Sequence, residues 1–163
     1  MIKIIRECSK KNLLIFMPVG FFSGLPLLLT SATLGTWLAD QNINKTTIGL
    51  FALVGLPYAF KFLWAPFLDI KILKYFSNRV GIRRFWIIIM QILICINIFV
   101  IGNIDPVEDT KILAFAALVL AFFSASHDIA IDAWRIEIHN KNEYGLGAAM
   151  YVTGYRLALL VAG

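Results

Sequence analysis

Five long apolar runs constrain this chain more than any other feature of its sequence. They extend over 13–38, 46–68, 85–104, 112–133 and 147–163, with short polar connections between them. A helix of about 20 residues crosses the roughly 30 Å hydrocarbon core of a bilayer. None of the runs alternates polar and apolar residues with the period of a membrane β-strand. We therefore expect an all-α membrane protein with five spans, the last of them cut short at Gly163.

The composition narrows the function classes. Apolar residues make up 60% of the chain and charged residues only 15%, which excludes a soluble enzyme, a disordered tail or a nucleic-acid-binding domain as the leading class. The net charge of +5 has to lie in the connections, where membrane lipid headgroups are the natural partners. The sequence holds no metal-ligand or nucleotide motif of the HExxH, CxxC or P-loop type, so no metal and no cofactor is expected.

The positive charges predict the orientation in the membrane. Eleven Lys and Arg residues lie before the first run or in the second and fourth connections, against two, Lys45 and Lys111, in the first and third. Positive residues favour the cytoplasmic side, so the N-terminus is expected in the cytoplasm. The eleven are Lys3, Arg6, Lys10, Lys11, Lys71, Lys74, Arg79, Arg83, Arg84, Arg135 and Lys141.

The first two runs are expected to be bent and to carry polar groups into the bundle. Gly20 and Gly24 are spaced for close helix approach, and Pro26 follows directly. Ser23 and Thr30 belong to a stripe of polar residues on the same run. The second run contains glycines and prolines, which are tolerated in lipid only where protein or water satisfies the freed backbone groups. Both runs therefore point to a polar cavity.

Four ionisable residues lie inside the predicted spans: Lys61, Asp128, Asp132 and Arg156. A charge stranded at the centre of a bilayer costs about 2.5–3.5 kcal/mol on insertion scales, so each is expected to face a partner or water. Asp128 and Asp132 share one face of their helix and are candidates for proton coupling. Lys61 and Arg156, with Ser23 and Thr30, are candidates for a substrate cavity that handles anions.

Each of these residues could instead serve only to stabilise the fold. Asp128 could pair with Lys61 or Arg156 simply to hold the bundle together. Asp132 is within reach of Arg135 on its own helix, and Lys61 could extend toward the cytoplasmic headgroups. Of the histidines, His139 falls in a connection and is expected to be solvated, while His127 adjoins Asp128 but points about 100° away around the helix.

Several segments closely resemble the AmpG muropeptide permease family. They are 20–26 (GFFSGLP), 47–58 (TIGLFALVGLPY), 61–66 (KFLWAP) with Asp69, 126–135 (SHDIAIDAWR), and Gly147 with 154–156 (GYR). The resemblance implies a major facilitator-type bundle of the bacterial inner membrane that imports anhydro-muropeptides with protons. It also implies that Asp69, Arg83 and Arg84 belong to a gating loop between the second and third helices. The related acetyl-CoA transporter branch is the nearest rival.

The sequence departs from the family pattern in two ways. His127 stands where the family more usually has an amide, and the chain ends inside the fifth helix, although such transporters carry a dozen or more helices in two halves. The primary expectation is the N-terminal portion of a proton-coupled importer, here truncated after about five helices. The alternatives are a non-transporting remnant and one subunit of a split transporter, completed by a C-terminal half or an oligomer. A membrane enzyme is a distant third, since no nucleophile and base pair is visible.

Overall fold

The computed structural model describes residues 11–69 and 81–162, and all of these fall in helices or short connections. Five helical segments are long and apolar enough to cross a membrane, over Phe16–Asp40, Lys45–Leu63, Ile82–Ile101, Thr110–Ile138 and Lys141–Ala162. The all-helical fold with five candidate spans is thus confirmed. The basic residues Lys3, Arg6, Lys10, Lys71, Lys74 and Arg79 lie outside the described part, as does the side chain of Lys11.

The fourth span continues further than the apolar run indicates. Helix α9 covers Thr110–Ile138 without interruption, so Arg135, expected in a connection, lies in the helix. Its guanidinium bonds the Asp132 carboxylate 2.9 Å away, one turn earlier on the same helix. This i,i+3 pairing explains how a charged turn can extend an apolar helix past its hydrophobic end.

The first span is irregular where Pro26 removes a backbone donor. It begins with the short helix α2 (Lys11–Leu14), continues as α3 (Phe16–Leu28), widens into a π-helical turn η1 (Leu29–Thr33) and ends as α4 (Leu34–Asp40). The carbonyl of Pro26, beside the start of this turn, accepts a hydrogen bond from the Thr30 hydroxyl at 2.9 Å. The bend expected at Pro26 therefore takes the form of a π turn whose polar groups are satisfied locally.

The second span alternates between helix types. The segments are α5 (Lys45–Leu50), η2 (Phe51–Gly55), α6 (Leu56–Phe60), η3 (Lys61–Leu63) and η4 (Ala65–Asp69), where the η segments are 3₁₀ turns. Asn44 caps the start by accepting a hydrogen bond from the Thr47 amide. The local breaks expected from the glycines and prolines of this run are confirmed.

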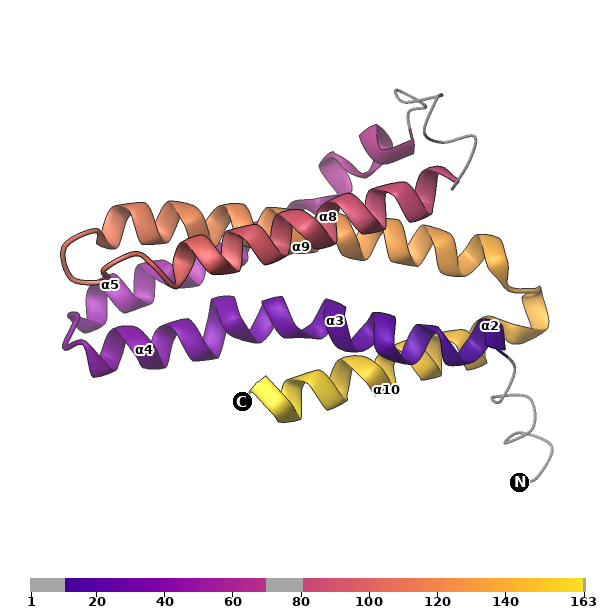
Figure 1. Cartoon of the computed structure of the whole chain (residues 1–163), viewed down its shortest axis with the longest axis horizontal. Coiled ribbons are helices and arrows are strands. Elements are labelled where there is room, and N and C mark those ends of the chain that lie inside the picture. Colours follow the sequence, from indigo (N-terminus) through magenta and orange to yellow (C-terminus); the bar gives the residue numbers. More distant parts are fainter. Residues whose placement is uncertain (1–10, 70–80, 163) are drawn as a thin grey trace.

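Close packing of glycines holds the first and fifth spans together. Helix α10 (Tyr144–Ala162), which follows the turn η5 (Lys141–Glu143), lies against α3 along much of its length (Figure 1). Gly20 of α3 contacts the backbone of Tyr151, and Gly154 of α10 contacts the carbonyl of Met17. No Cβ fits at either position, so the glycines set the distance between these two helices.

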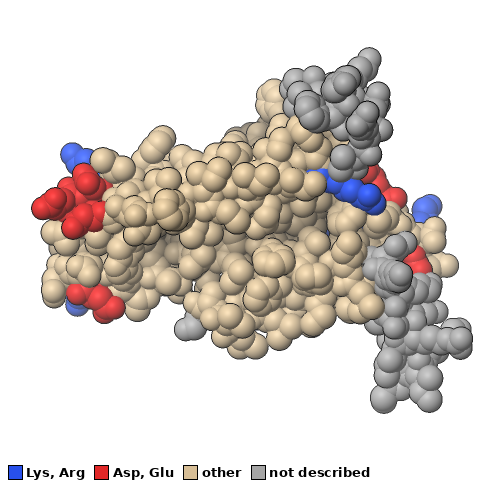
Figure 2. Space-filling model, viewed as in Figure 1, with Lys and Arg blue, Asp and Glu red and all other residues tan. Residues whose placement is uncertain are grey.

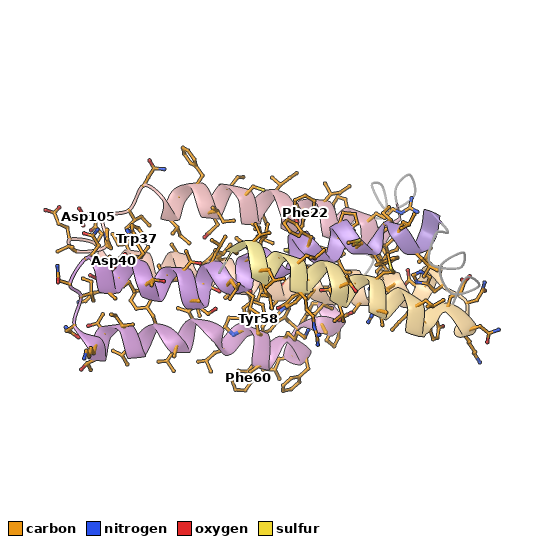
Figure 3. All side chains as sticks on the ribbon, turned by 90° about the horizontal axis from the view of Figure 1, so that it is seen from below. Phe22, Trp37, Asp40, Tyr58, Phe60 and Asp105 are labelled. Carbon is orange, nitrogen blue, oxygen red and sulfur yellow. The ribbon has the colours of Figure 1, made fainter. Side chains whose placement is uncertain are left out.

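The other spans complete a bundle with an apolar middle and polar ends. Helix α8 (Ile82–Ile101) packs along α9, and a buried cluster formed by Leu34, Leu38, Phe51, Val54 and Leu113 joins α4, η2 and α9. On the face shown in Figure 2, charged side chains gather at the two ends and leave an uncharged band between them. Asp40 and Asp105 lie at the same end of the bundle (Figure 3). This distribution is what a bilayer requires.

Candidate functional site

A polar cluster joins three spans inside the bundle. Asp128 of α9 is buried and accepts a hydrogen bond from the hydroxyl of Ser23 on α3, which is 1% exposed. The hydroxyl of Tyr151 on α10 lies 2.9 Å from Ser23 Oγ and 3.4 Å from the nearer Asp128 oxygen. Ser23 and Asp128, predicted separately from the sequence, are thus brought into direct contact. A buried carboxylate held by hydroxyls is a group that can bind and release a proton.

Asp128 does not form the ion pair with Lys61 or Arg156 that was the alternative to a role in proton coupling. Within 11–69 and 81–162 no ion pair joins Asp128 to Lys61 or Arg156. Lys61, in η3, is half-buried and close enough to act on Asp128 through its charge alone. Arg156 is exposed on α10, so the described helices do not bring it into the cluster. Hydroxyl groups, rather than a cation, are the direct partners of this carboxylate.

Two more buried hydroxyls lie near the cluster and near each other, and neither makes a hydrogen bond of normal geometry with the described residues. They are Ser124 Oγ, one turn before Asp128 on α9, and the hydroxyl of Tyr58 on α6. Tyr58 and Thr30 line a cavity of about 230 Å³ between the first and second spans. Figure 3 shows Tyr58 within the bundle, while Phe60, two residues further, is at its edge. Buried unpaired hydroxyls cost free energy, so they mark a place where a ligand group or water can bind.

Sequence reasoning missed Tyr151 and Tyr58. Tyr151 lies three residues before Gly154, so both share the face of α10 that meets α3. That spacing was the available signal, because it places Tyr151 on the helix face that packs against α3. Tyr58 carries a weaker signal: it directly follows Pro57 in a span already expected to line a cavity.

Asp132, the second candidate for proton coupling, forms the contact with Arg135 that its position on the helix suggested, and its part in coupling stays a prediction. Its carboxylate is half-exposed and pairs with Arg135, whose guanidinium carbon also lies 5.6 Å from the centre of the Tyr151 ring. Asp132 therefore belongs to a second polar group, one turn further along α9 and in contact with the first through Tyr151.

The candidate gating residues that the structure describes lie at one end of the bundle. Arg83 bonds Glu137 of α9 at 2.9 Å, and the guanidinium of Arg84 lies 5.5 Å from the centre of the Trp134 ring. Both arginines therefore connect the start of α8 to the end of α9. The side chain of Asp69 lies outside the described residues, so its relation to them stays a prediction.

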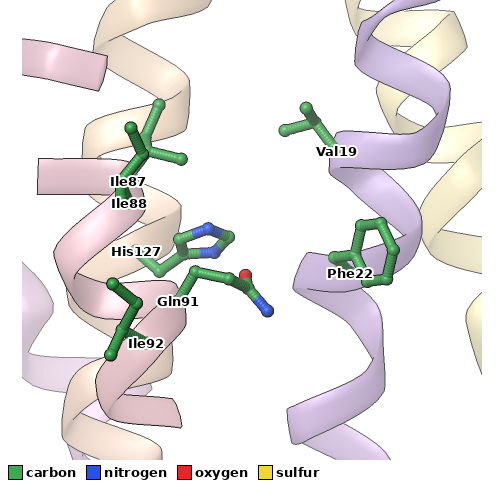
Figure 4. Close-up of a pocket in the computed structure, with 7 residues that line it drawn as sticks. All are labelled: Val19, Phe22, Ile87, Ile88, Gln91, Ile92 and His127. Carbon is green, nitrogen blue, oxygen red and sulfur yellow. The ribbon is translucent and has the colours of Figure 1, made fainter. Parts of the chain in front are cut away.

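The two histidines occupy different environments, and one expectation is wrong. His139 is buried rather than solvated: its Nδ1 lies 2.9 Å from the carbonyl of Arg135, and its ring contacts the Phe16 ring at a tilt, with the ring centres 4.9 Å apart. The end of α9 folds it back against Gly147 at the start of α10. His127, as expected, points away from Asp128, into a groove of about 360 Å³ between α3 and α8, beside Gln91 (Figure 4).

The chain is similar in sequence to known transporter proteins. A profile of the family described as acetyl-coenzyme A transporter 1 matches residues 12–112. The chain is 46% identical over 149 residues to the anhydromuropeptide permease of Escherichia coli K12, covering 91% of this chain and 30% of that protein. It is 35% identical over 152 residues to the putative transporter AmpG 1 of Rickettsia bellii, covering 93% of this chain and 37% of that protein. It is 36% identical over 155 residues to the putative transporter AmpG 1 of Rickettsia felis, covering 95% of this chain and 35% of that protein.

The helical spans and the buried polar cluster, together with these matches, define a multi-pass membrane protein of the transporter class and not an enzyme. The chain belongs to the AmpG, or anhydromuropeptide permease, family of major facilitator transporters. It spans about a third of the length of the curated relatives that it matches.

Proposed function

We propose that this chain forms the proton-coupling part of a transporter that imports anhydro-muropeptides across the bacterial inner membrane. The observation that carries the proposal is the buried Asp128, held by Ser23 and Tyr151 with no ion-pair partner in the described part of the chain. Because a fixed cation would keep a carboxylate ionised, its replacement by neutral hydroxyls leaves Asp128 able to change its proton occupancy.

The substrate is proposed to bind beside this carboxylate. The unpaired hydroxyls of Tyr58 and Ser124 and the cavity lined by Thr30 offer hydrogen-bonding groups to a sugar or peptide, and Lys61 supplies a positive charge. Binding at a midplane site between moving bundles is the general arrangement of secondary transporters. Arg156, exposed on α10, is proposed to face a further part of the full-length transporter and to contribute from there.

Gating is proposed for the end of the bundle that carries Arg83 and Arg84. Their contacts with Glu137 and Trp134 link α8 to α9 across the cytoplasmic ends of these spans, and Asp69 is proposed to join them. Glu137 and Arg84 are exposed, and contacts with exposed groups can break and re-form at low cost, which suits alternating access.

The orientation follows as a proposal from the charge distribution. The N-terminus lies in the cytoplasm, and the turn at 102–109, which carries Asp105, lies on the outer side. In a variant with Cys8→Ser and Cys95→Ser, a cysteine introduced at Asn103 should react with a membrane-impermeant maleimide added to spheroplasts. Protection of this cysteine until the membrane is permeabilised would contradict the orientation.

A chimera tests the function directly. Residues 1–163 replace the matching segment of the Escherichia coli anhydromuropeptide permease in cells that lack their own permease. We expect uptake of labelled anhydro-muropeptide that an uncoupler abolishes and that Asp128→Asn removes. A chimera present in the membrane at the parental level but inactive, or active and insensitive to the uncoupler, would contradict the proposal.

Transport of acetyl-coenzyme A is the second candidate, because the matching family profile carries that description. It is separated from the first by competition in the same cells. Excess unlabelled acetyl-coenzyme A should leave muropeptide uptake unchanged if the first proposal holds. Inhibition, with uptake of labelled acetyl-coenzyme A itself, would favour the second.

A further inference from the structure

Tyr151 is the one side chain of the described helices that the structure records touching both polar groups of α9. Its hydroxyl lies 2.9 Å from Ser23 Oγ and 3.4 Å from Asp128, while its ring faces the guanidinium of Arg135 at 5.6 Å. Arg135 in turn pairs with Asp132 at 2.9 Å. The deep carboxylate and the ion pair near the end of the helix therefore meet on opposite parts of one side chain.

The direction of the hydrogen bonds follows from the number of protons available. Ser23 has one hydroxyl proton, and this proton is donated to Asp128. The Tyr151 hydroxyl must then donate to Ser23 Oγ, with Asp128 as its longer alternative acceptor. The protons are thus relayed from Tyr151 to Ser23 and from Ser23 to the carboxylate, an arrangement that suits the ionised form of Asp128 and that its protonation would weaken.

The ring contact depends on the same placement of Tyr151. The Arg135 side chain is about four-fifths buried, and a partly desolvated guanidinium is attracted to the face of an aromatic ring. The Tyr151 backbone cannot shift to accommodate changes independently, because its carbonyl packs against Gly20 of α3. A change in the hydroxyl contacts must therefore be taken up by rotation of the side chain, which moves the ring relative to Arg135.

We propose that Tyr151 is a positioning residue that ties the charge of Asp128 to the Asp132–Arg135 pair. This inference rests on the proposed role of Asp128 as the carrier of the coupling proton. In the ionised state the two hydroxyls hold the ring against Arg135. In the protonated state these hydrogen bonds weaken, the ring is free to turn, and Arg135 is free to change partners at the end of α9, where α8 is also attached. Protonation of Asp128 thereby changes the contacts of Arg135 at the end of the bundle.

Double-mutant cycles test the two contacts without any transport assay. The chain is reconstituted in lipid nanodiscs and its thermal unfolding is followed. Tyr151→Phe removes the hydroxyl and keeps the ring, so its effect should be non-additive with Asp128→Asn. Because the ring is no longer held against Arg135, its effect should also be non-additive with Arg135→Gln. Tyr151→Leu removes both the hydroxyl and the aromatic ring. Its effect should be non-additive with Asp128→Asn and with Arg135→Gln. Tyr144→Phe, the same change at an exposed tyrosine of α10, should be additive with Asp128→Asn. Additivity of Tyr151→Phe with Asp128→Asn would overturn the proposal.

Transport by the chimera tests what the contacts do. Tyr151→Phe should lower uncoupler-sensitive accumulation of anhydro-muropeptide at least tenfold while leaving exchange of labelled for unlabelled substrate within about twofold. A merely structural role would reduce both in proportion to the amount of folded protein, and that result would overturn the inference. If the parental chimera itself transports nothing, the proposed function fails, whereas the unfolding cycles still decide whether Tyr151 joins the two groups.

Discussion

The hydroxyl of Ser23 on α3 donates a hydrogen bond to the carboxylate of Asp128 on α9, and so connects the first and fourth spans at a buried polar point. The residues are 105 positions apart in the sequence, and the surrounding packing is largely apolar. In such surroundings a hydrogen bond to a charged group is worth more than one at the surface. The contact therefore serves both the bundle and the proposed chemistry.

Ser23→Ala should weaken the protein and its coupling together. It removes a donor from a buried carboxylate and leaves Asp128 with the longer Tyr151 contact, at an expected cost of about 1–3 kcal/mol in unfolding free energy. Thermal unfolding and uncoupler-sensitive uptake measure the two effects. Thr36→Val is the control, because Thr36 is exposed, lies outside the proposed substrate cavity and donates its hydroxyl proton to the carbonyl of Ala32 in its own helix. Equal stability of the two variants would contradict this account.

Gly154→Ala should force α3 and α10 apart. A Cβ at this position meets the backbone carbonyl of Met17, which cannot move without the helix, so we expect a loss of about 1–3 kcal/mol. Gly145→Ala in the first turn of the same helix is the control, since a Cβ there has nothing within 4 Å. The control should be neutral or stabilising, because alanine favours helix by up to about 1 kcal/mol over glycine. A destabilised control with an unaffected Gly154→Ala would refute the packing argument.

Tyr58→Phe should separate stability from substrate binding. The Tyr58 hydroxyl is buried and makes no hydrogen bond of normal geometry in the described part of the chain. Its removal is therefore expected to leave the free energy of unfolding unchanged or slightly raised. If this hydroxyl binds the substrate, the KM for uptake should rise several-fold while kcat changes little. The exposed Tyr144→Phe supplies the control for the chemical change itself. An unchanged KM would remove Tyr58 from the proposed substrate site.

Glu137→Gln should affect gating more than stability. The pair with Arg83 is exposed on the Glu137 side, so its loss should cost less than about 1 kcal/mol. The rate of substrate exchange should nevertheless change if the contact opens and closes in each cycle. Glu108→Gln, at the opposite end of the bundle, is the control for loss of one exposed negative charge. Identical exchange rates in parent and both variants would argue against a gating role at Glu137.

Much of the fold could be predicted because membrane spans are determined by local hydrophobicity. The five runs, the bend at Pro26 and the close approach at Gly20 and Gly24 all follow from properties of short segments. The end of α9 could not be placed in this way. Arg135 terminates an apolar run, yet the pair with Asp132 and the aromatic face of Tyr151 keep it helical.

The site was less accessible to sequence reasoning because it depends on which helices are neighbours. Ser23 and Asp128 could each be selected as polar groups in an apolar span, but the sequence does not state that they touch. Charge alone suggested Lys61 and Arg156 as the partners of Asp128, whereas the packing of α3 against α10 brings hydroxyls there instead. The same packing buries His139, whose position in a polar connection suggested a solvated ring.

The most direct test of the central claim is the effect of Asp128→Asn on two modes of transport by the chimera. Uncoupler-sensitive accumulation of anhydro-muropeptide requires a proton to bind and leave, whereas exchange of internal for external substrate does not. If Asp128 carries the coupling proton, Asp128→Asn should abolish accumulation and retain exchange. Accumulation at the parental level in this variant would contradict the account.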